Sequence, residues 1–175
     1  MKIPTIKTKN FILRPFVARD AAAVAKNAND KAIGRNTTSI PYPYSLADAK
    51  EWLKKVAVRN KQCNPDTINF AIDINGEAAG SISLMKIQEG HKAEIGYWLG
   101  KEYRGGGIMG AAVAEIVKYG FKELKLRRIY GHVFTFNKIS KKVLEKNGFK
   151  LEGILKKYAR KNGRFIDVYL LAKVK

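Results

Sequence analysis

Cysteine and histidine are scarce in this chain of 175 residues: Cys63 is its only cysteine, and His91 and His132 are its only histidines. A single cysteine cannot close an internal disulfide or build a cysteine metal cluster. The two histidines belong to no His-x-His or His-Glu-x-x-His spacing, and no carboxylate cluster lies near them in the sequence. The sequence therefore predicts neither a disulfide framework nor a metal site.

Long apolar runs are also missing. A membrane-spanning helix needs about 20 consecutive apolar residues, and no stretch of the sequence approaches that length. The first residues, Met1 to Thr5, lack the apolar core of a secretory signal. We therefore expect a cytoplasmic protein without a membrane partner.

Acidic residues are few: 15 Asp and Glu stand against 34 Lys and Arg, for a formal net charge of +19. Such a charge attracts anions and raises the rate at which they are encountered. Nucleic acid, a ribosomal surface or a phosphorylated cofactor would each fit, whereas a polyamine or a lysine-rich tail would be repelled. The charge would equally suit the ordinary solvated surface of a protein from a salt-rich or hot cytoplasm.

Hydrophobic residues make up 46% of the chain and charged residues 28%, which is typical of a folded globular protein. No internal repeat, linker or low-complexity tract interrupts the sequence. Residues 1–175 are therefore expected to form a single domain with a good core.

Alternating apolar residues and turn signals favour seven strands. The turn dipeptides Asn75-Gly76 and Asn162-Gly163 each join two of them as a hairpin. A helical segment separates the fourth strand from the fifth, so these two should run parallel. The expected strands cover residues 10–15, 68–74, 77–85, 93–99, 128–133, 149–159 and 165–172.

Polar residues at the right spacing mark the helix ends. Asp20 is expected to cap a helix that fades near Gly34. Ser45 resembles the first residue of a capping box, with the carboxylate three residues later. Asn137 should cap a short helix that ends at Gly148, a residue able to adopt a left-handed conformation.

A cationic glycine loop runs directly into a helix after the fourth strand. The glycines Gly105, Gly107 and Gly110 have the spacing of a dinucleotide-binding fingerprint, but the acidic residue at the expected distance, Glu123, lies in the same helix. A nucleotide P-loop would need a lysine at Ala111. Both interpretations fail on context, although a plain glycine-rich turn stays possible.

A third interpretation is the pyrophosphate loop of an acetyltransferase, with the pattern [R/Q]-x-x-G-x-[G/A]. Arg104 and Gly107 satisfy this pattern, whereas Met109 departs from it at the last position. The first N–H groups of a helix have no internal partner, and glycines allow a phosphate close to the backbone. The predicted pyrophosphate ligands are Arg104, Gly105, Gly106, Gly107, Ile108, Met109 and Gly110.

Three motifs, taken in order, resemble the GNAT family of acetyl-CoA-dependent N-acetyltransferases. The glycine loop, the strand over Ile129 and the segment 137–149 carry the resemblance. The run Glu94-Ile95-Gly96-Tyr97-Trp98-Leu99 and the Asn-x-x-Ser start of the segment 137–149 are similar to the branch of ribosomal-protein N-terminal acetyltransferases of RimJ and RimL type.

The resemblance implies an α+β fold, with a strongly twisted mixed sheet of about seven strands and helices on both faces. Two central parallel strands should splay apart and admit acetyl-CoA. Its pantetheine amides could pair with the strand backbone at Tyr97, Trp98 and Leu99. Asn137 and Ser140 should contact the same arm, and Gly96 would suit a bulge in the strand.

Amide formation from a thioester requires a neutral amine, so a base should lie near the reacting carbon. Glu94 is the candidate base, acting through water, and an N–H near Tyr97 could hold the carbonyl oxygen. Many members of the family supply a tyrosine to the leaving sulfur at the position of Leu144. Here that phenol is missing, and Ser140 is the candidate hydroxyl. His132 could face the acceptor or could be structural.

The resemblance implies acetyl transfer to a primary amine by direct attack. The expected acceptor is the α-amino terminus of a protein, and the branch resemblance points to ribosomal proteins. Two alternatives stay open: a small-molecule amine acetyltransferase, and a non-catalytic module that binds CoA or RNA. The basic surface could contact RNA or the ribosome, and the protein could be a monomer or a homodimer.

Overall fold

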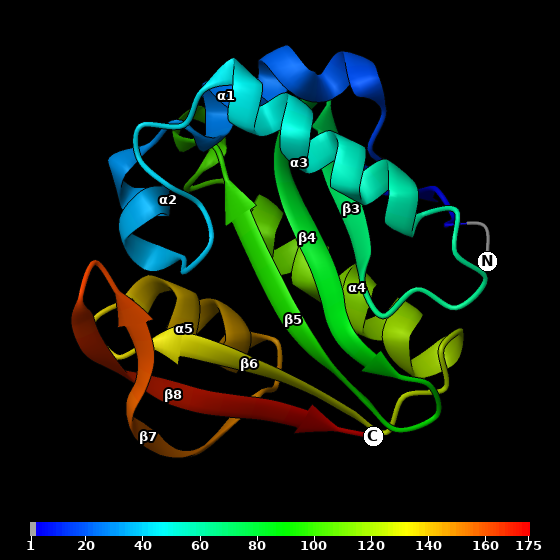
Figure 1. The fold of residues 1–175 in the computed structure, drawn as a ribbon. Helices are drawn as coiled ribbons and strands as arrows, with labels where there is room; N and C mark the ends of the chain where they lie inside the picture. Colours follow the sequence, from blue (N-terminus) through cyan, green and yellow to red (C-terminus); the bar gives the residue numbers. More distant parts are fainter. Residues whose placement is uncertain (1–2) are drawn as a thin grey trace.

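The computed structural model describes residues 3–175, which fold around one mixed sheet (Figure 1). Its eight strands lie in the order β1-β2-β3-β4-β5-β6-β8-β7, and only the β5–β6 pair is parallel. The strands are β1 (Ile6–Lys7), β2 (Ile12–Pro15), β3 (Ile68–Ile74), β4 (Glu77–Gln88), β5 (Lys92–Leu99), β6 (Arg128–Phe134), β7 (Lys150–Lys161) and β8 (Arg164–Val174). The predicted fold class is confirmed, with the short edge strand β1 added.

Helices cover both faces of the sheet and form two apolar layers (Figure 1). One layer lies between the sheet and α4, and it continues to α5. The other lies between the opposite face and the pair α1 and α3. The helices are α1 (Ala21–Ala28), α2 (Lys31–Asn36), α3 (Leu46–Arg59), α4 (Ile108–Lys122) and α5 (Lys138–Lys146).

Two predicted helix starts are confirmed by their hydrogen bonds. The Asp48 carboxylate accepts from the Ser45 N–H at 2.8 Å, and Ser45 Oγ accepts from the Asp48 N–H at 3.2 Å, so the capping box of α3 is complete. Asn137 Oδ1 accepts from the Ser140 N–H at 3.1 Å at the start of α5. Gly148 follows α5 with φ of +81°. These short-range patterns determine where each helix begins or ends.

Asp20 is the N-cap residue of α1, as predicted, but its side chain makes no capping hydrogen bond to that helix. The carboxylate of Asp20 is buried and binds both terminal nitrogens of Arg14 at 2.8 Å. It also accepts from the Val17 N–H at 2.9 Å. A buried carboxylate requires a charged partner, and Arg14 on β2 supplies one, so tertiary pairing prevails over local capping. The helical region also breaks into α1 and α2, and Asp30 caps the second.

The parallel strands β5 and β6 separate soon after they meet. They are paired at Lys92 with Arg128, at Ala93 with Ile129 and at Glu94 with Tyr130. Beyond Glu94, β5 follows β4 as far as Leu99, whereas β6 stays with β8 (Figure 1). The facing edges of both strands therefore carry backbone groups outside the ladder that joins them. This is the predicted splay.

The bulge expected at Gly96 is not there. Gly96 pairs in regular register with Ser83, and the irregularity lies across the sheet between Met85 and Gln88, where Lys86 has φ of +50°. Gly96 instead makes room for a neighbouring side chain: a Cβ at this position would lie 2.7 Å from Met85 Cε. Close packing against Met85 therefore accounts for the glycine at position 96, and a bulge in the backbone does not.

Candidate active site

A cleft of about 1230 Å³ follows the line where β5 and β6 separate. The glycine loop and the start of α5 line one part of it, and α1, α2 and α3 with the loop 37–41 line the other. The cleft thus passes through the sheet from the α4 side to the α1 and α3 side. A substrate bound in it can reach side chains that belong to opposite faces of β5.

The glycine loop is shaped to receive an anion. Gly105 and Gly107 have φ of +90° and +76°, conformations that other residues adopt only with strain. No atom lies within 4 Å of a Cβ built at Gly105, Gly106 or Gly107, so the loop is open on its outer side. Gly107 is the N-cap of α4, whose first N–H groups have no partner in the helix. These features fit a phosphate group.

The guanidinium of Arg104 is already engaged. Its Nε donates to the Leu99 carbonyl at 2.9 Å, and a terminal nitrogen lies 2.8 Å from Asp30 Oδ2. These bonds join the glycine loop to the end of β5 and to the start of α2. Contact between Arg104 and a pyrophosphate stays a prediction, and the contacts present give the side chain a role in fixing the loop.

Glu94 lies at the point where β5 and β6 part, on the face toward α1 and α3. Its carboxylate is 2.8 Å from His132 Nδ1 and 2.7 Å from Lys86 Nζ. Burial alone would raise the pKa of Glu94, but the contacts with His132 and Lys86 outweigh burial and the pKa is lowered. Glu94 is therefore ionised at neutral pH inside the cleft.

His132, for which the sequence left open a structural role or a place facing the acceptor, belongs to this site. Its imidazole stacks on Tyr158 with ring centroids 4.6 Å apart and planes at 24°, and Tyr130 meets its edge at 5.5 Å. Glu94 holds Nδ1. His132 lines the cleft. No sequence signal joins the two residues, because their contact depends on the register between β5 and β6.

A second pair of groups occupies the opposite face of β5. The Tyr97 hydroxyl lies 2.9 Å from Ser140 Oγ and 3.3 Å from the Ser140 carbonyl oxygen. Burial raises the pKa of Tyr97 to about 12, with a smaller opposite effect from the Ser140 hydrogen bond. Leu144, where the family resemblance suggests a tyrosine, is buried and apolar.

Tyr97 and Trp98 point to opposite faces of β5, as their alternation predicts. Tyr97 packs against the layer beneath α4, and Trp98 packs against the layer of α1 and α3. Both side chains line the cleft. The strand edge at Tyr97, Trp98 and Leu99 is the part that β6 leaves unpaired.

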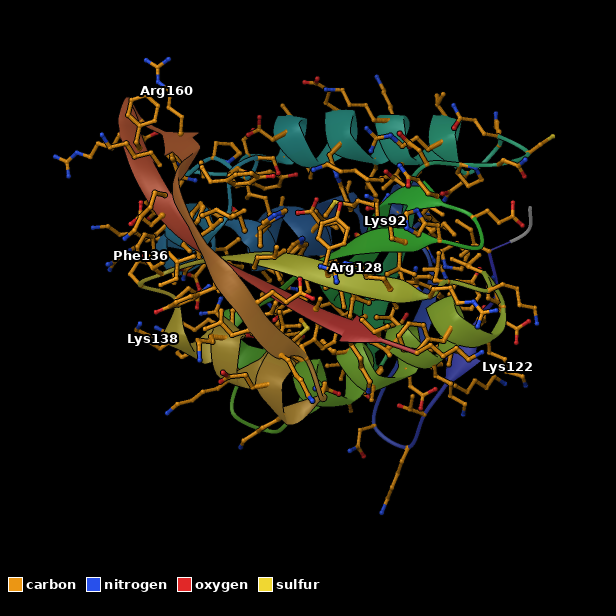
Figure 2. All side chains as sticks on the ribbon, turned by 90° about the horizontal axis from the view of Figure 1, so that it is seen from below. Lys92, Lys122, Arg128, Phe136, Lys138 and Arg160 are labelled. Atoms are coloured by element: carbon orange, nitrogen blue, oxygen red, sulfur yellow. The ribbon has the colours of Figure 1, made fainter. Side chains whose placement is uncertain are left out.

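Basic residues are concentrated toward the C-terminus. Residues 138–175 include 12 of the 34 Lys and Arg but only three of the 15 Asp and Glu. They form α5 and the β7–β8 hairpin, where Arg160 extends from the body of the protein (Figure 2). The field of this region should attract anions toward one side of the molecule.

Residues 3–175 offer neither a cluster of metal ligands nor a membrane-spanning helix. No three His, Cys, Asp or Glu side chains in this range gather as a possible metal site. No helix in the same range has both the length and the apolar character to span a membrane.

Residues 10–150 match the family model described as the acetyltransferase (GNAT) domain, so the chain belongs to the GNAT family. It is an acetyl-CoA-dependent N-acetyltransferase by this membership. The L-amino acid N-acetyltransferase AaaT of Escherichia coli is 27% identical over 94% of this chain and 98% of its own. The ribosomal-protein-serine acetyltransferase of Escherichia coli is 36% identical over 60% of this chain and 59% of its own.

The fold is also similar to the folds of solved structures. The crystal structure of the ribosomal-protein-S5-alanine acetyltransferase from Vibrio fischeri superimposes with a TM-score of 0.85 at 27% identity. The match covers 98% of this chain and 97% of that one. The similarity therefore includes the splayed strands and the helices around the cleft.

Proposed function

We propose that this enzyme acetylates the α-amino terminus of a protein, with acetyl-CoA and the acceptor meeting where β5 and β6 separate. The observation that carries the proposal is the ionised Glu94 paired with His132 inside the cleft, on the face opposite Ser140. An amine that enters from the α1 and α3 side would reach this pair. A thioester that enters from the α4 side would reach Ser140.

The residues that would hold acetyl-CoA fit its chemistry. The open loop from Gly105 to Gly110 offers backbone N–H groups to the diphosphate. The free edge of β5 at Tyr97, Trp98 and Leu99 offers backbone partners to the pantetheine amides. Asn137 uses its carbonyl oxygen to cap α5, so only its amide nitrogen would be available to the same arm.

Glu94 and His132 would remove the proton from the attacking ammonium. The lowered pKa of Glu94 makes this carboxylate a weak base by itself. We therefore assign it to hold His132 Nδ1, which leaves the imidazole Nε2 to accept the proton directly or through water. The N–H groups near Tyr97 and Trp98 would then bind the carbonyl oxygen as negative charge develops on it. No covalent enzyme intermediate is needed.

Two relatives support a protein as acceptor: the ribosomal-protein-serine acetyltransferase of Escherichia coli and the ribosomal-protein-S5-alanine acetyltransferase of Vibrio fischeri are both named for ribosomal proteins. An α-amine also suits the chemistry, because its pKa near 8 lies well below the value near 10.4 of a lysine. Ribosomal proteins are themselves basic, so the +19 charge would repel them in isolation. RNA bound along α5 and the β7–β8 hairpin would offset this repulsion.

A second candidate acceptor is a small amine. AaaT, whose name gives L-amino acids as its substrates, matches nearly the whole chain. A free amino acid carries a carboxylate that the positive field of this protein would attract. Both candidates place the same α-amine before the same thioester, and they differ in what the outer part of the cleft must accommodate.

The two candidates are separated by a panel of acceptors with acetyl-CoA, using thiol release and product mass as readouts. Peptides with an N-terminal Ser or Ala and neutral residues thereafter should react. The same peptides with a blocked terminus and an internal lysine should not. Reaction with free amino acids alone would favour the second candidate. CoA binding without thiol release from any amine would leave only a non-catalytic module.

A further inference from the structure

The site lacks the phenol that the family resemblance leads one to expect on α5. Leu144 fills that position, and its Cδ1 would lie 3.2 Å from a Cβ added at Gly131. Its side chain is buried and has no polar atom. The leaving sulfur therefore receives no hydrogen bond from residue 144.

A different phenol reaches the same end of the cleft from the opposite wall. Tyr97 extends from β5 on the α4 side, and its hydroxyl lies 2.9 Å from Ser140 Oγ in the first turn of α5. Both side chains line the cleft. Tyr97 and Ser140 thus link the two walls at the side where the thioester would enter.

We propose that Tyr97 is a positioning residue whose hydroxyl donates a hydrogen bond to Ser140 Oγ. This bond directs the hydroxyl hydrogen of Ser140 toward the sulfur of CoA. This inference rests on the proposed placement of CoA in the cleft. A hydroxyl oxygen that accepts one hydrogen bond still has its own proton to donate. In such a chain each bond polarises the next, so Ser140 becomes the better donor.

The pair acts through hydrogen bonds and does not transfer its protons. The pKa of Tyr97 is raised to about 12, whereas a thiol has a pKa near 8.5. Moving the phenolic proton to sulfur would therefore be uphill. When the carbon–sulfur bond breaks, its electron pair stays on sulfur, Ser140 stabilises the thiolate, and water later supplies the proton.

Either hydroxyl can donate across the 2.9 Å contact between Tyr97 and Ser140 Oγ. The contact of the Tyr97 hydroxyl with the Ser140 carbonyl is longer, at 3.3 Å. We assign the donor role to Tyr97, because only then does Ser140 keep its own proton for the sulfur.

The test is the pKa of the CoA thiol bound to the protein, followed by the ultraviolet absorbance of the thiolate in a pH titration. Wild-type protein should lower this pKa relative to free CoA. Ser140→Ala and Tyr97→Phe should each raise it by about one unit, the size expected for one hydrogen bond to an ion. The double variant should match Ser140→Ala, because Tyr97 acts only through that hydroxyl.

Two controls accompany the titration. Tyr119→Phe removes a buried phenol on α4 that packs against Phe70 of β3, and it should leave the thiol pKa unchanged. Ser140→Thr keeps the hydroxyl and should keep the lowered pKa, which covers the case in which Tyr97→Phe fails to fold. With acetyl-CoA as donor, the Ser140 and Tyr97 variants should lower kcat about tenfold and leave KM for the acceptor unchanged.

Several results would overturn the relay. Shifts that add in the double variant would mean that Tyr97 reaches the sulfur independently, and no shift in Tyr97→Phe would remove it from the site. Loss of the lowered pKa in Ser140→Thr would also contradict the relay. Because CoA alone is the probe, these results do not depend on the acceptor. If CoA does not bind to the wild-type protein, the proposed function itself fails.

Discussion

The two faces of β5 differ in the kind of chemistry they offer to the same cleft. Toward α1 and α3, Glu94 is charged and in contact with His132 and Lys86. Toward α4, Tyr97 is neutral and bonded to the hydroxyl of Ser140. Burial pushes both pKa values upward, but only Glu94 has cationic neighbours that reverse the direction. In the proposed mechanism, one strand thus separates a site that handles a proton from a site that stabilises a thiolate.

The largest expected effect comes from removing the charge on the acceptor side. Glu94→Gln should lower kcat at neutral pH by about 100-fold or more, because the imidazole loses its anionic partner. His132→Gln should have a similar effect, and the double variant should be no worse than the worse single one, since the two act as a unit. The defect should shrink above about pH 8, where an α-amine is already neutral.

CoA affinity, measured by calorimetry, should be unchanged in these variants if the two faces are independent. Glu77→Gln is the matched control, because Glu77 is also a strand carboxylate near a lysine but lies outside the cleft. An unaltered pH profile in Glu94→Gln would remove this residue from proton transfer. A large loss of CoA affinity would show that the faces are not separate.

The next largest effect is expected on the stability of the glycine loop, on the side of the cleft where CoA would bind. Gly107→Ala places a side chain at φ of +76° and should lower the free energy of unfolding by about 1–2 kcal/mol. The neighbouring Gly106→Ala is the matched control, since Gly106 is open and has no positive φ. Its melting temperature should be unchanged or slightly raised. Equal destabilisation by the two changes would contradict the described loop conformation.

A smaller effect is expected at Arg104. Arg104→Gln should weaken CoA binding only a few-fold, because the guanidinium already binds Asp30 and the Leu99 carbonyl. The loss should diminish in high salt, as a charge contribution does. Lys54→Gln on the exposed side of α3 removes one charge elsewhere and serves as control. If calorimetry showed equal losses of CoA affinity in Arg104→Gln and Lys54→Gln, Arg104 would contribute only through the overall charge of the protein.

The smallest effect is on stability against acid. Because the folded pKa of Glu94 lies below its ordinary value, the ionised group stabilises the fold above about pH 4.3, and this contribution disappears as the pH falls through the folded value. The difference in unfolding free energy between wild type and Glu94→Gln should therefore decline in that range. Denaturant titrations that give a constant difference would contradict the paired, ionised state.

Local signals in the sequence predicted most of the fold. The Ser45 capping box, the Asn137 cap and the Asn75-Gly76 turn depend on residues a few positions apart, and all three are present. The side chain of Asp20 does not cap α1, because it pairs with the partly buried Arg14 on another element. The bulge predicted at Gly96 is absent, because the glycine is there to make room for the Met85 side chain on the neighbouring strand. Contacts across the sheet are invisible to a local pattern.

The candidate site shows the same division. The glycine loop and the edge of β5 could be located from spacing and from the family resemblance. The Glu94–His132 and Tyr97–Ser140 pairs could not, because each joins residues about 40 positions apart through strand register or helix placement. The roles of these residues stay predictions until they are measured.

The most direct measurement is a crystal structure with CoA bound. The account predicts that the diphosphate contacts the backbone between Gly105 and Gly110 and that the sulfur lies within hydrogen-bonding distance of Ser140 Oγ, with Glu94 still paired to His132 across the cleft. A sulfur atom next to Glu94, or a diphosphate bound away from the glycine loop, would contradict the division of labour between the two faces of β5.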